Sequence, residues 1–240
     1  MKRPRFDLVV KVGGSLGRGR APLRTVVGQL VRAARDARVL VVPGGGVFAD
    51  RVRREHRRLG IDAATAHRMA LRATDQFGLL LAAQHPRAVA VTDLDAAVRV
   101  CRRGRLAVLL PAVLVERRPS LERTFRLTSD SIAAWVASAG PARSLLVLKR
   151  VRGLDRFSAD GTGFGDLQRR GVLDPLFARH LPSGLAVRVA EWRRALAPGR
   201  RGHAGRPPVP SGGAPARTAA RGARRAGRGG RRSTAPRARR

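Results

Sequence analysis

Six short apolar segments recur along the chain, and they constrain its fold more than any other feature of the sequence. Each is five or six residues long and rich in β-branched residues, as expected for strands that are buried on both faces of a sheet. The segments are LVVKV at 8–12, VLVVP at 39–43, AVAVT at 88–92, LAVLLP at 106–111, SLLVLK at 144–149 and LAVRVA at 185–190.

Helical patterns lie between these segments. Apolar residues spaced by three and four predict helices over 21–37 and 62–84, and TSDSIAAWVASAG predicts a helix that starts at a capping sequence and ends at Gly140. Strands that alternate with helices form a parallel sheet with helices on both faces. We therefore predict an α/β fold, a three-layer αβα sandwich around a mainly parallel open sheet, with ligands at the carboxyl ends of the strands.

The choice of basic residues singles out two positions. The chain has 50 lysines and arginines, but only Lys2, Lys11 and Lys149 are lysines. Lys11 and Lys149 each lie towards the end of an apolar segment, where a compact ammonium group can do what a planar guanidinium cannot. Lys149 is interpreted either as a phosphate contact or as an ordinary charge at the end of a strand.

Two glycine-rich turns follow the first two predicted strands. KVGGS at 11–15 can point successive backbone N–H groups at an anion, although it matches neither a P-loop nor a dinucleotide-binding fingerprint. PGGG at 43–46 has three consecutive glycines, which are costly to order and offer no evident packing. The favoured interpretation is the floor of a pocket that a ligand contacts through the backbone, and the alternative is a simple tight turn.

Two further motifs occur later in the chain. RLTSDS at 126–131 places Asp130 in the first turn of a predicted helix, either as a favourable charge at the helix start or as a carboxylate that orients two lysines. LLVLKRVRGLDRFSADG at 145–161 ends a strand at Lys149 and continues into a glycine-containing loop.

In this order, the four motifs resemble those of the amino acid kinase superfamily, which includes acetylglutamate, aspartate, glutamate-5-, uridylate and isopentenyl phosphate kinases. The resemblance covers about residues 6–196 and implies the carbamate kinase-like form of the fold within a domain at 1–196. It implies an acceptor lobe over about 1–115 and a nucleotide lobe over about 116–196. The implied activity is that of an ATP-dependent phosphotransferase.

The resemblance also implies roles for individual residues. Lys11 would neutralise the migrating γ-phosphoryl group, Asp130 would orient the lysines, and Lys149 or its neighbour Arg150 would hold the nucleotide phosphates. The residues that would bind ATP are Lys11, Gly13, Gly14, Ser15, Lys149, Gly153, Phe157 and Asp160. The residues that would bind the acceptor are Gly44, Gly45, Gly46, Arg51, His67 and Asp75. No side chain is assigned as a metal ligand, and Mg²⁺ is expected to bridge the β- and γ-phosphates of ATP.

Within the superfamily, PGGGVFADRVR and LTSDSIAAW resemble most the small kinases of methanofuran-type cofactor biosynthesis. These convert [5-(aminomethyl)furan-3-yl]methyl phosphate into its diphosphate. On this resemblance Arg51, Arg54 and Arg68 are available to bind the acceptor phosphate, Asp75 could pair with its amine and His67 could contact either group. The alternative for each of these residues is an ordinary solvated helix face. A phosphate acceptor is already anionic, so its in-line attack needs no general base.

Several alternatives stay open. One is a uridylate or isopentenyl phosphate kinase-like enzyme. Isopentenyl phosphate kinases have a motif similar to GGGSFGH, and the corresponding GGGVFAD of this chain lacks its histidine. Another is a non-catalytic relative that only binds nucleotides or polyanions; such a protein should tolerate loss of Lys11 or Asp130, which are both present. The nucleotide loop also departs from the family pattern, with V-R-G at 151–153 in place of V-D-G.

The composition changes at Ala197. The segment 197–240 consists mainly of Pro, Gly, Ala and Arg, with 13 arginines and no acidic residue, and we predict it to be disordered. It could bind a polyanion, but no aromatic residue stands among its arginines to stack on bases, so any contact with nucleic acid would be non-specific. The favoured interpretation is an extension from a coding background rich in arginine codons.

The cysteine count and the lack of long apolar runs exclude several kinds of site and segment. A single cysteine, Cys101, allows no intrachain disulfide and no thiolate metal cluster. No signal-peptide pattern and no apolar run of 18 residues occurs, so we expect a cytoplasmic protein without a membrane partner. A homo-oligomer is an expectation from the family resemblance.

Overall fold

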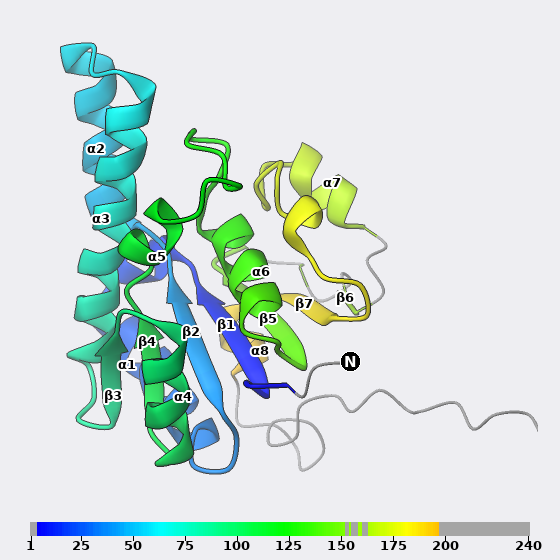
Figure 1. Ribbon diagram of the computed structural model, residues 1–240. Helices are drawn as coiled ribbons and strands as arrows, with labels where there is room; N and C mark the ends of the chain where they lie inside the picture. Colours follow the sequence, from blue (N-terminus) through cyan, green and yellow to red (C-terminus); the bar gives the residue numbers. More distant parts are fainter. Residues whose placement is uncertain (1–3, 152–153, 155–157, 160–162, 197–240) are drawn as a thin grey trace, which may run out of the picture. The chain divides into compact units, whose positions relative to one another are not determined.

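The protein is described by a computed structural model over residues 4–151, 154, 158–159 and 163–196. Within these residues, seven strands form one sheet in the order β3-β4-β2-β1-β5-β7-β6 (Figure 1). The strands are β1 (Leu8–Val12), β2 (Val39–Pro43), β3 (Ala88–Val91), β4 (Leu106–Leu109), β5 (Ser144–Lys149), β6 (Ser158–Ala159) and β7 (Ala186–Glu191). All six strands predicted from the sequence are present; the two-residue β6 was not predicted.

The strand directions place the carboxyl ends at one edge of the sheet. All neighbours run parallel except β6, which pairs with β7 in the antiparallel sense. At the centre of the sheet, Lys11 of β1 lies opposite Val42 of β2 on one side and Val147 of β5 on the other. The turns that follow β1, β2 and β5 therefore meet at the same edge.

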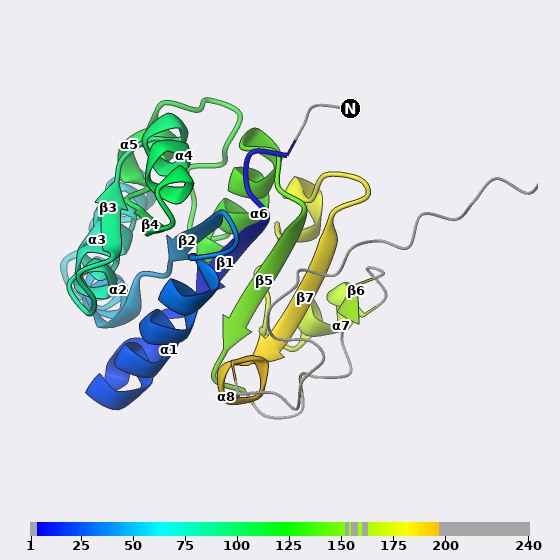
Figure 2. The same cartoon turned by 90° about the horizontal axis from the view of Figure 1, so that it is seen from below.

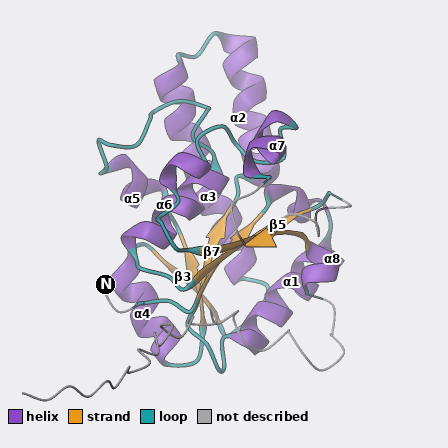
Figure 3. Ribbon diagram, turned by 90° about the vertical axis from the view of Figure 1, so that its right-hand side faces the viewer, coloured by secondary structure: helices purple, strands orange, loops and turns teal. Residues whose placement is uncertain are grey.

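Helices cover both faces of the sheet (Figures 2 and 3). They are α1 (Arg20–Ala33), α2 (Gly46–Leu59), α3 (Ala63–Ala82), α4 (Leu94–Arg102), α5 (Ala112–Glu116), α6 (Ser129–Ala139), α7 (Phe164–Arg169) and α8 (Trp192–Ala195), with short 3₁₀ turns η1 (Gly14–Arg18) and η3 (Ala178–His180). Alternate residues of β1 enter the two core layers: Val9 packs in the layer that includes α4 and α6, and Val10 packs in the layer that includes α1 and α8. The predicted α/β fold with a mainly parallel sheet is confirmed.

Two helices extend past the carboxyl edge of the sheet. In Figure 1, α2 and α3 form an antiparallel pair that continues beyond the strands. Gly60, with φ of +64°, ends α2, and the Asp62 side chain caps α3 by accepting a hydrogen bond from the Thr65 N–H at 2.8 Å. This pair forms one wall above the edge of the sheet.

The sheet is continuous from β4 through β1 and β5 to β7, so it spans both of the lobes predicted from the sequence. The lobe boundary stays a prediction. The segment 197–240, predicted to be disordered, lies outside the described residues. Among the described residues, no helix combines the length and apolar character needed to cross a membrane.

Candidate active site

The two glycine turns interlock at the edge of the sheet. The Gly44 N–H donates to the Val12 carbonyl at 2.9 Å. A Cβ atom on Gly14 would lie 2.2 Å from the Gly46 nitrogen, and one on Gly44 would lie 2.7 Å from the Gly14 nitrogen. These contacts permit only glycine, since the neighbours are backbone atoms. The sequence-based view that the three glycines offer no packing was therefore wrong: they bring the two turns into backbone contact.

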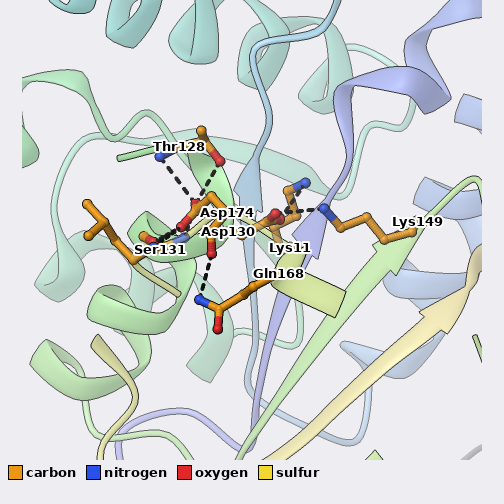
Figure 4. A network of polar contacts seen from close by, with 8 residues as sticks. Lys11, Thr128, Asp130, Ser131, Lys149, Gln168 and Asp174 are labelled. Atoms are coloured by element: carbon orange, nitrogen blue, oxygen red, sulfur yellow. Dashed lines mark hydrogen bonds and ion pairs between the residues drawn. The ribbon is translucent and has the colours of Figure 1, made fainter. Parts of the chain in front are cut away.

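Lys11 and Lys149 meet at Asp130 beside these turns (Figure 4). The Lys11 Nζ lies 2.8 Å from Asp130 Oδ1, and the Lys149 Nζ lies 2.6 Å from Asp130 Oδ2. Lys11 is 5% exposed and Asp130 is 4% exposed. The pairing arises because β1 and β5 are neighbours in the sheet and α6 starts over their carboxyl ends. The buried ammonium group of Lys11 and the partly exposed one of Lys149 thus share one buried carboxylate.

Burial and the neighbouring charges shift the pKa values of Asp130 and Lys149. Burial disfavours the ionised form of Asp130, but the two lysines outweigh burial and hold the pKa of this carboxyl below its usual range. Burial lowers the pKa of Lys149, the positive charge of Lys11 lowers it further, and Asp130 offsets part of the effect, leaving the pKa of Lys149 at about 8. The resting site therefore holds more positive charge than one carboxylate can neutralise, which suits a polyanionic ligand.

A cavity of about 520 Å³ opens in front of this group. The glycine turns form its floor, since Gly13, Gly14, Ser15, Gly45 and Gly46 line it together with the two lysines and Asp130. The glycine turns and the start of α2 thus border a space large enough for a small ligand, and backbone N–H groups at such turns can contact an anion. The site lies where the topology of a parallel sheet predicts it.

The wall formed by α2 and α3 includes Gly46 and His67, which were predicted, and several residues that the sequence-based assignment missed. One face of α2 contributes Gly46, Ala49, Asp50 and Arg53, and one face of α3 contributes His67, Ala70, Leu71 and Thr74. The Asp50 carboxylate pairs with Arg18 at 3.4 Å and with Arg53 at 3.1 Å. Phe125 also lines the cavity. The wall offers charges to a ligand, and Phe125, from the segment between α5 and α6, adds an aromatic ring.

Only some of the predicted acceptor residues line the cavity. Gly45, Gly46 and His67 line the cavity, whereas Gly44 does not and packs against Gly14. Burial lowers the pKa of His67, with Arg123 acting in the same direction, which favours the neutral imidazole.

Two of the predicted acceptor residues are not brought into the cavity. Arg51 pairs with Glu55 at 2.7 Å on another face of α2. Asp75 accepts a hydrogen bond from the Ala112 N–H at 3.0 Å at the start of α5. Asp75 is half-buried, and that burial raises the pKa of its carboxyl. The cavity lining gives no support to an acceptor role for either residue.

The opposite wall includes Gln168 and residues 171–175. Its Asp174 is 7% exposed and accepts hydrogen bonds from Thr128 and Ser131 at the start of α6. Thr128 holds the N-cap position, but its own side chain makes no capping hydrogen bond. The sequence predicted where α6 starts but gave no signal for the carboxylate that caps it.

The remaining predicted nucleotide residues, Gly153, Phe157 and Asp160, lie outside the described residues. Within the described part of the chain, no group of three or more His, Cys, Asp or Glu side chains gathers to hold a metal ion. The residues present fit a Mg²⁺ ion that is bound through substrate phosphates, because this ion commonly keeps several waters and takes few ligands from the protein.

The pKa of Lys149 leads to a prediction about pH. Below about pH 8 the side chain is charged in the free protein and would attract phosphates; above it the charge is lost. We expect kcat/KM for ATP to fall as the pH rises through about 8, because this parameter reports the free enzyme. At saturating ATP the decline in kcat should occur at higher pH, since bound phosphates favour the ammonium form.

The matched control is Lys149→Arg, whose charge does not titrate in this range. Its activity should be lower, but its kcat/KM should be flat across the same pH range. A wild-type profile with no decline between about pH 7 and 9.5 would show that Lys149 does not carry ATP binding.

Two lysines and two glycine turns around a cavity at the edge of a parallel sheet supply placed charge and backbone donors, which is what phosphoryl transfer requires of a protein. A family model described as "Amino acid kinase family" matches residues 8–169. The chain belongs to this family and is a phosphotransferase.

Individual relatives refine this placement. Over 150 residues, the chain is 27% identical to the [5-(aminomethyl)furan-3-yl]methyl phosphate kinase of Methanocaldococcus jannaschii, covering 62% of this chain and 68% of that protein. The uridylate kinase structure from Archaeoglobus fulgidus matches with a TM-score of 0.60 and 21% identity, over 79% of this chain and 94% of that chain. The UMP kinase structure from Ureaplasma parvum matches with a TM-score of 0.53 and 16% identity, over 77% of this chain and 88% of that chain. At these identities the structural matches support the fold alone.

Proposed function

We propose that this protein transfers the γ-phosphoryl group of ATP to the phosphate of a small phosphate monoester that also carries an amine. The acceptor that we favour is [5-(aminomethyl)furan-3-yl]methyl phosphate, the substrate named for the curated relative. The observation that carries the kinase chemistry is the contact of Lys11 and Lys149 with one buried carboxylate beside the glycine floor.

Each residue of the charged group would have its own role in the transfer. Lys11 lies deepest, next to the Gly13 turn, and would neutralise charge on the phosphoryl group in transfer. Lys149 would bind the nucleotide phosphates, and Asp130 would hold both ammonium groups in place. When bound with ATP, Mg²⁺ neutralises the β- and γ-phosphates. The glycine N–H groups would orient the phosphate oxygens for in-line attack.

The acceptor would contact the wall that carries Asp50. An amine could replace the arginines as the partner of this carboxylate, which would release Arg18 and Arg53 to bind the acceptor phosphate. The ring of Phe125 offers a flat apolar surface for a furan. Because the acceptor phosphate is anionic at neutral pH, the reaction needs no side chain to remove a proton.

The test is ADP release from Mg-ATP by the full-length protein. Candidate acceptors are the aminomethylfuran phosphate, the same furan phosphate with a methyl group in place of the aminomethyl group, and uridine monophosphate. We expect turnover on the first, and an increase of about 10-fold or more in KM when the amine is absent, as expected for loss of a charged hydrogen bond. Asp50→Asn should abolish this preference without changing KM for ATP.

The outcomes separate the candidates. Turnover on uridine monophosphate alone would keep the kinase chemistry and overturn the acceptor. An amine preference that survives in Asp50→Asn would overturn the role of Asp50. Lys11→Ala is the inactive control, and a protein that binds ATP but releases no ADP with any acceptor would be a non-catalytic relative.

A further inference from the structure

One carboxylate outside the lysine group gathers several hydrogen bonds at the start of α6. Asp174 accepts from the Thr128 N–H at 3.2 Å, the Thr128 hydroxyl at 2.7 Å and the Ser131 N–H at 2.9 Å (Figure 4). It also accepts from the Ser131 hydroxyl and from the Leu176 N–H at 3.0 Å. A nearly buried side chain with five donors is held in one position.

These contacts make Asp174 the cap of a helix from which it is 43 residues distant in sequence. In an ordinary cap, the Thr128 oxygen would accept from the Ser131 N–H. Here the Thr128 hydroxyl donates instead, and the carboxylate takes the Ser131 N–H. A negative charge at this position also favours the positive end of the helix. Asp130 lies between these two residues, so the same contacts fix the backbone that carries it.

Asp174 also belongs to a cavity wall. Residues 171–175 line the cavity, and Gln168 fastens the turn by donating from Nε2 to the carbonyls of Asp174 and Pro175, each at 2.9 Å. The wall is thus joined to the start of α6 through the Asp174 side chain. A displacement of this wall would remove the cap beside Asp130.

We propose that Asp174 is a positioning residue for phosphoryl transfer, whose carboxylate couples the seating of the 171–175 wall to the orientation of Asp130 and of the two lysines. Asp174 does not touch the reacting atoms in this role. The inference rests on the proposed roles of Lys11, Asp130 and Lys149.

The charge of Asp174 supplies a readout that a purely structural role would not change. Lys149 is influenced by Lys11 from β1, by Asp130 from α6 and by Asp174 from the cavity wall. Burial and Lys11 lower the pKa of Lys149, and the two carboxylates raise it. Asp174→Asn retains the shape of the side chain and removes one of the charges that raise this pKa.

The experiment measures Mg-ATP binding by calorimetry, without acceptor, from about pH 6.5 to 9.5, together with kcat at pH 7. For Asp174→Asn we expect the loss of affinity with rising pH to begin at lower pH than in the wild type. We expect kcat to fall by about 10- to 100-fold, the range expected for hydrogen bonds to a charged group.

The matched control is Asp7→Asn, at the other end of β1. Asp7 is less buried than Asp174, but it likewise joins distant segments, accepting from the Arg38 N–H at 2.9 Å and from its guanidinium at 3.0 Å. This variant should lower the melting temperature without moving the pH dependence of ATP binding.

A second variant keeps the proposal testable if Asp174→Asn does not fold. Thr128→Val removes one donor to Asp174 and leaves its charge in place, so it should lower kcat without moving the pH profile. Thr128→Ser restores the hydroxyl and should restore kcat.

The coupling is wrong if Asp174→Asn has the kcat and the pH profile of the wild type. It is also wrong if Thr128→Val and Thr128→Ser have equal kcat. If the wild type releases no ADP with any acceptor, the proposed function itself fails, and if Lys11→Ala and Asp130→Asn keep full turnover, the proposed roles of these two residues fail. If they lose it while Asp174→Asn does not, only the role of Asp174 fails.

Discussion

Replacement of Lys11 with alanine should lower kcat by about 100-fold or more, the loss typical of removing a single electrostatic donor from an active site. Its ammonium group is buried beside Gly13 and would lie against the phosphoryl group as its charge redistributes. KM for ATP should change less, because Lys149 and the glycine N–H groups still contact the nucleotide. Steady-state ADP release is the measurement, and unchanged turnover would end the proposed role of Lys11.

Two further substitutions separate charge from packing. Lys11→Met keeps most of the side-chain volume, so it should reproduce the loss of kcat with little change in melting temperature. It should also move the pH decline of kcat/KM for ATP upward, because Lys11 is one of the groups that lower the pKa of Lys149. Lys11→Arg keeps the charge but needs more space beside the glycine turn, so its kcat should lie between those of alanine and wild type.

Substitution of Asp130 with asparagine should remove both activity and stability. The carboxylate is the shared partner of two ammonium groups, so its loss leaves like charges close together in a buried place. Breaking a buried ion pair typically costs about 3–5 kcal/mol of folding free energy. We expect a lower denaturant midpoint, a lower pKa for Lys149 and a loss of kcat/KM of about 100-fold or more.

A double variant distinguishes the two effects. Asp130→Asn combined with Lys149→Met removes one of the two repelling charges, so it should regain much of the lost stability and none of the activity. If the single and double variants unfold at the same denaturant concentration, the lysines do not repel one another as proposed. If Asp130→Asn is active, its role in orienting the lysines is wrong.

The strands and the floor of the site could be predicted because their signals are local. Buried parallel strands are apolar throughout, so each stood out in the sequence, and the glycine turns and the lysines followed directly from the strand ends. Parallel pairing then brings those ends together without further information. The contact of Lys11 and Lys149 with Asp130 needed only this topology and the start of one helix.

The acceptor wall was predicted less well, although helix geometry carried the necessary signal. Counting from Gly46, positions three, four and seven residues later fall on one face of α2, and these are the residues that line the cavity. Arg51 lies off this face. The same spacing from His67 on α3 reaches Thr74 and leaves Asp75, one residue further, outside the cavity lining. Arg51 and Asp75 were assigned to the site because of their charges. Their positions on the helices, which decide whether a residue lines the cavity, were not taken into account.

Asp174 could not have been found in this way. It is a lone acidic residue in a turn, and the partners that make it a helix cap, Thr128 and Ser131, lie in a different part of the sequence. Its role depends on how the segment after α7 packs against α6, which no local pattern reports. The glycines at 44–46 are a similar case, since the need for them comes from the neighbouring turn.

The pairing of β1 with β5 has a consequence for how the enzyme is made. Val9 pairs with Leu145, so the strands that carry the two lysines come from opposite halves of the chain. Closing so long a loop is slow compared with forming the local helices. A nascent chain would acquire α1, β2 and α3 well before it could bring Lys149 beside Lys11. Neither half can assemble the charged group alone, so catalytic competence arises only once the central strands of the sheet are joined.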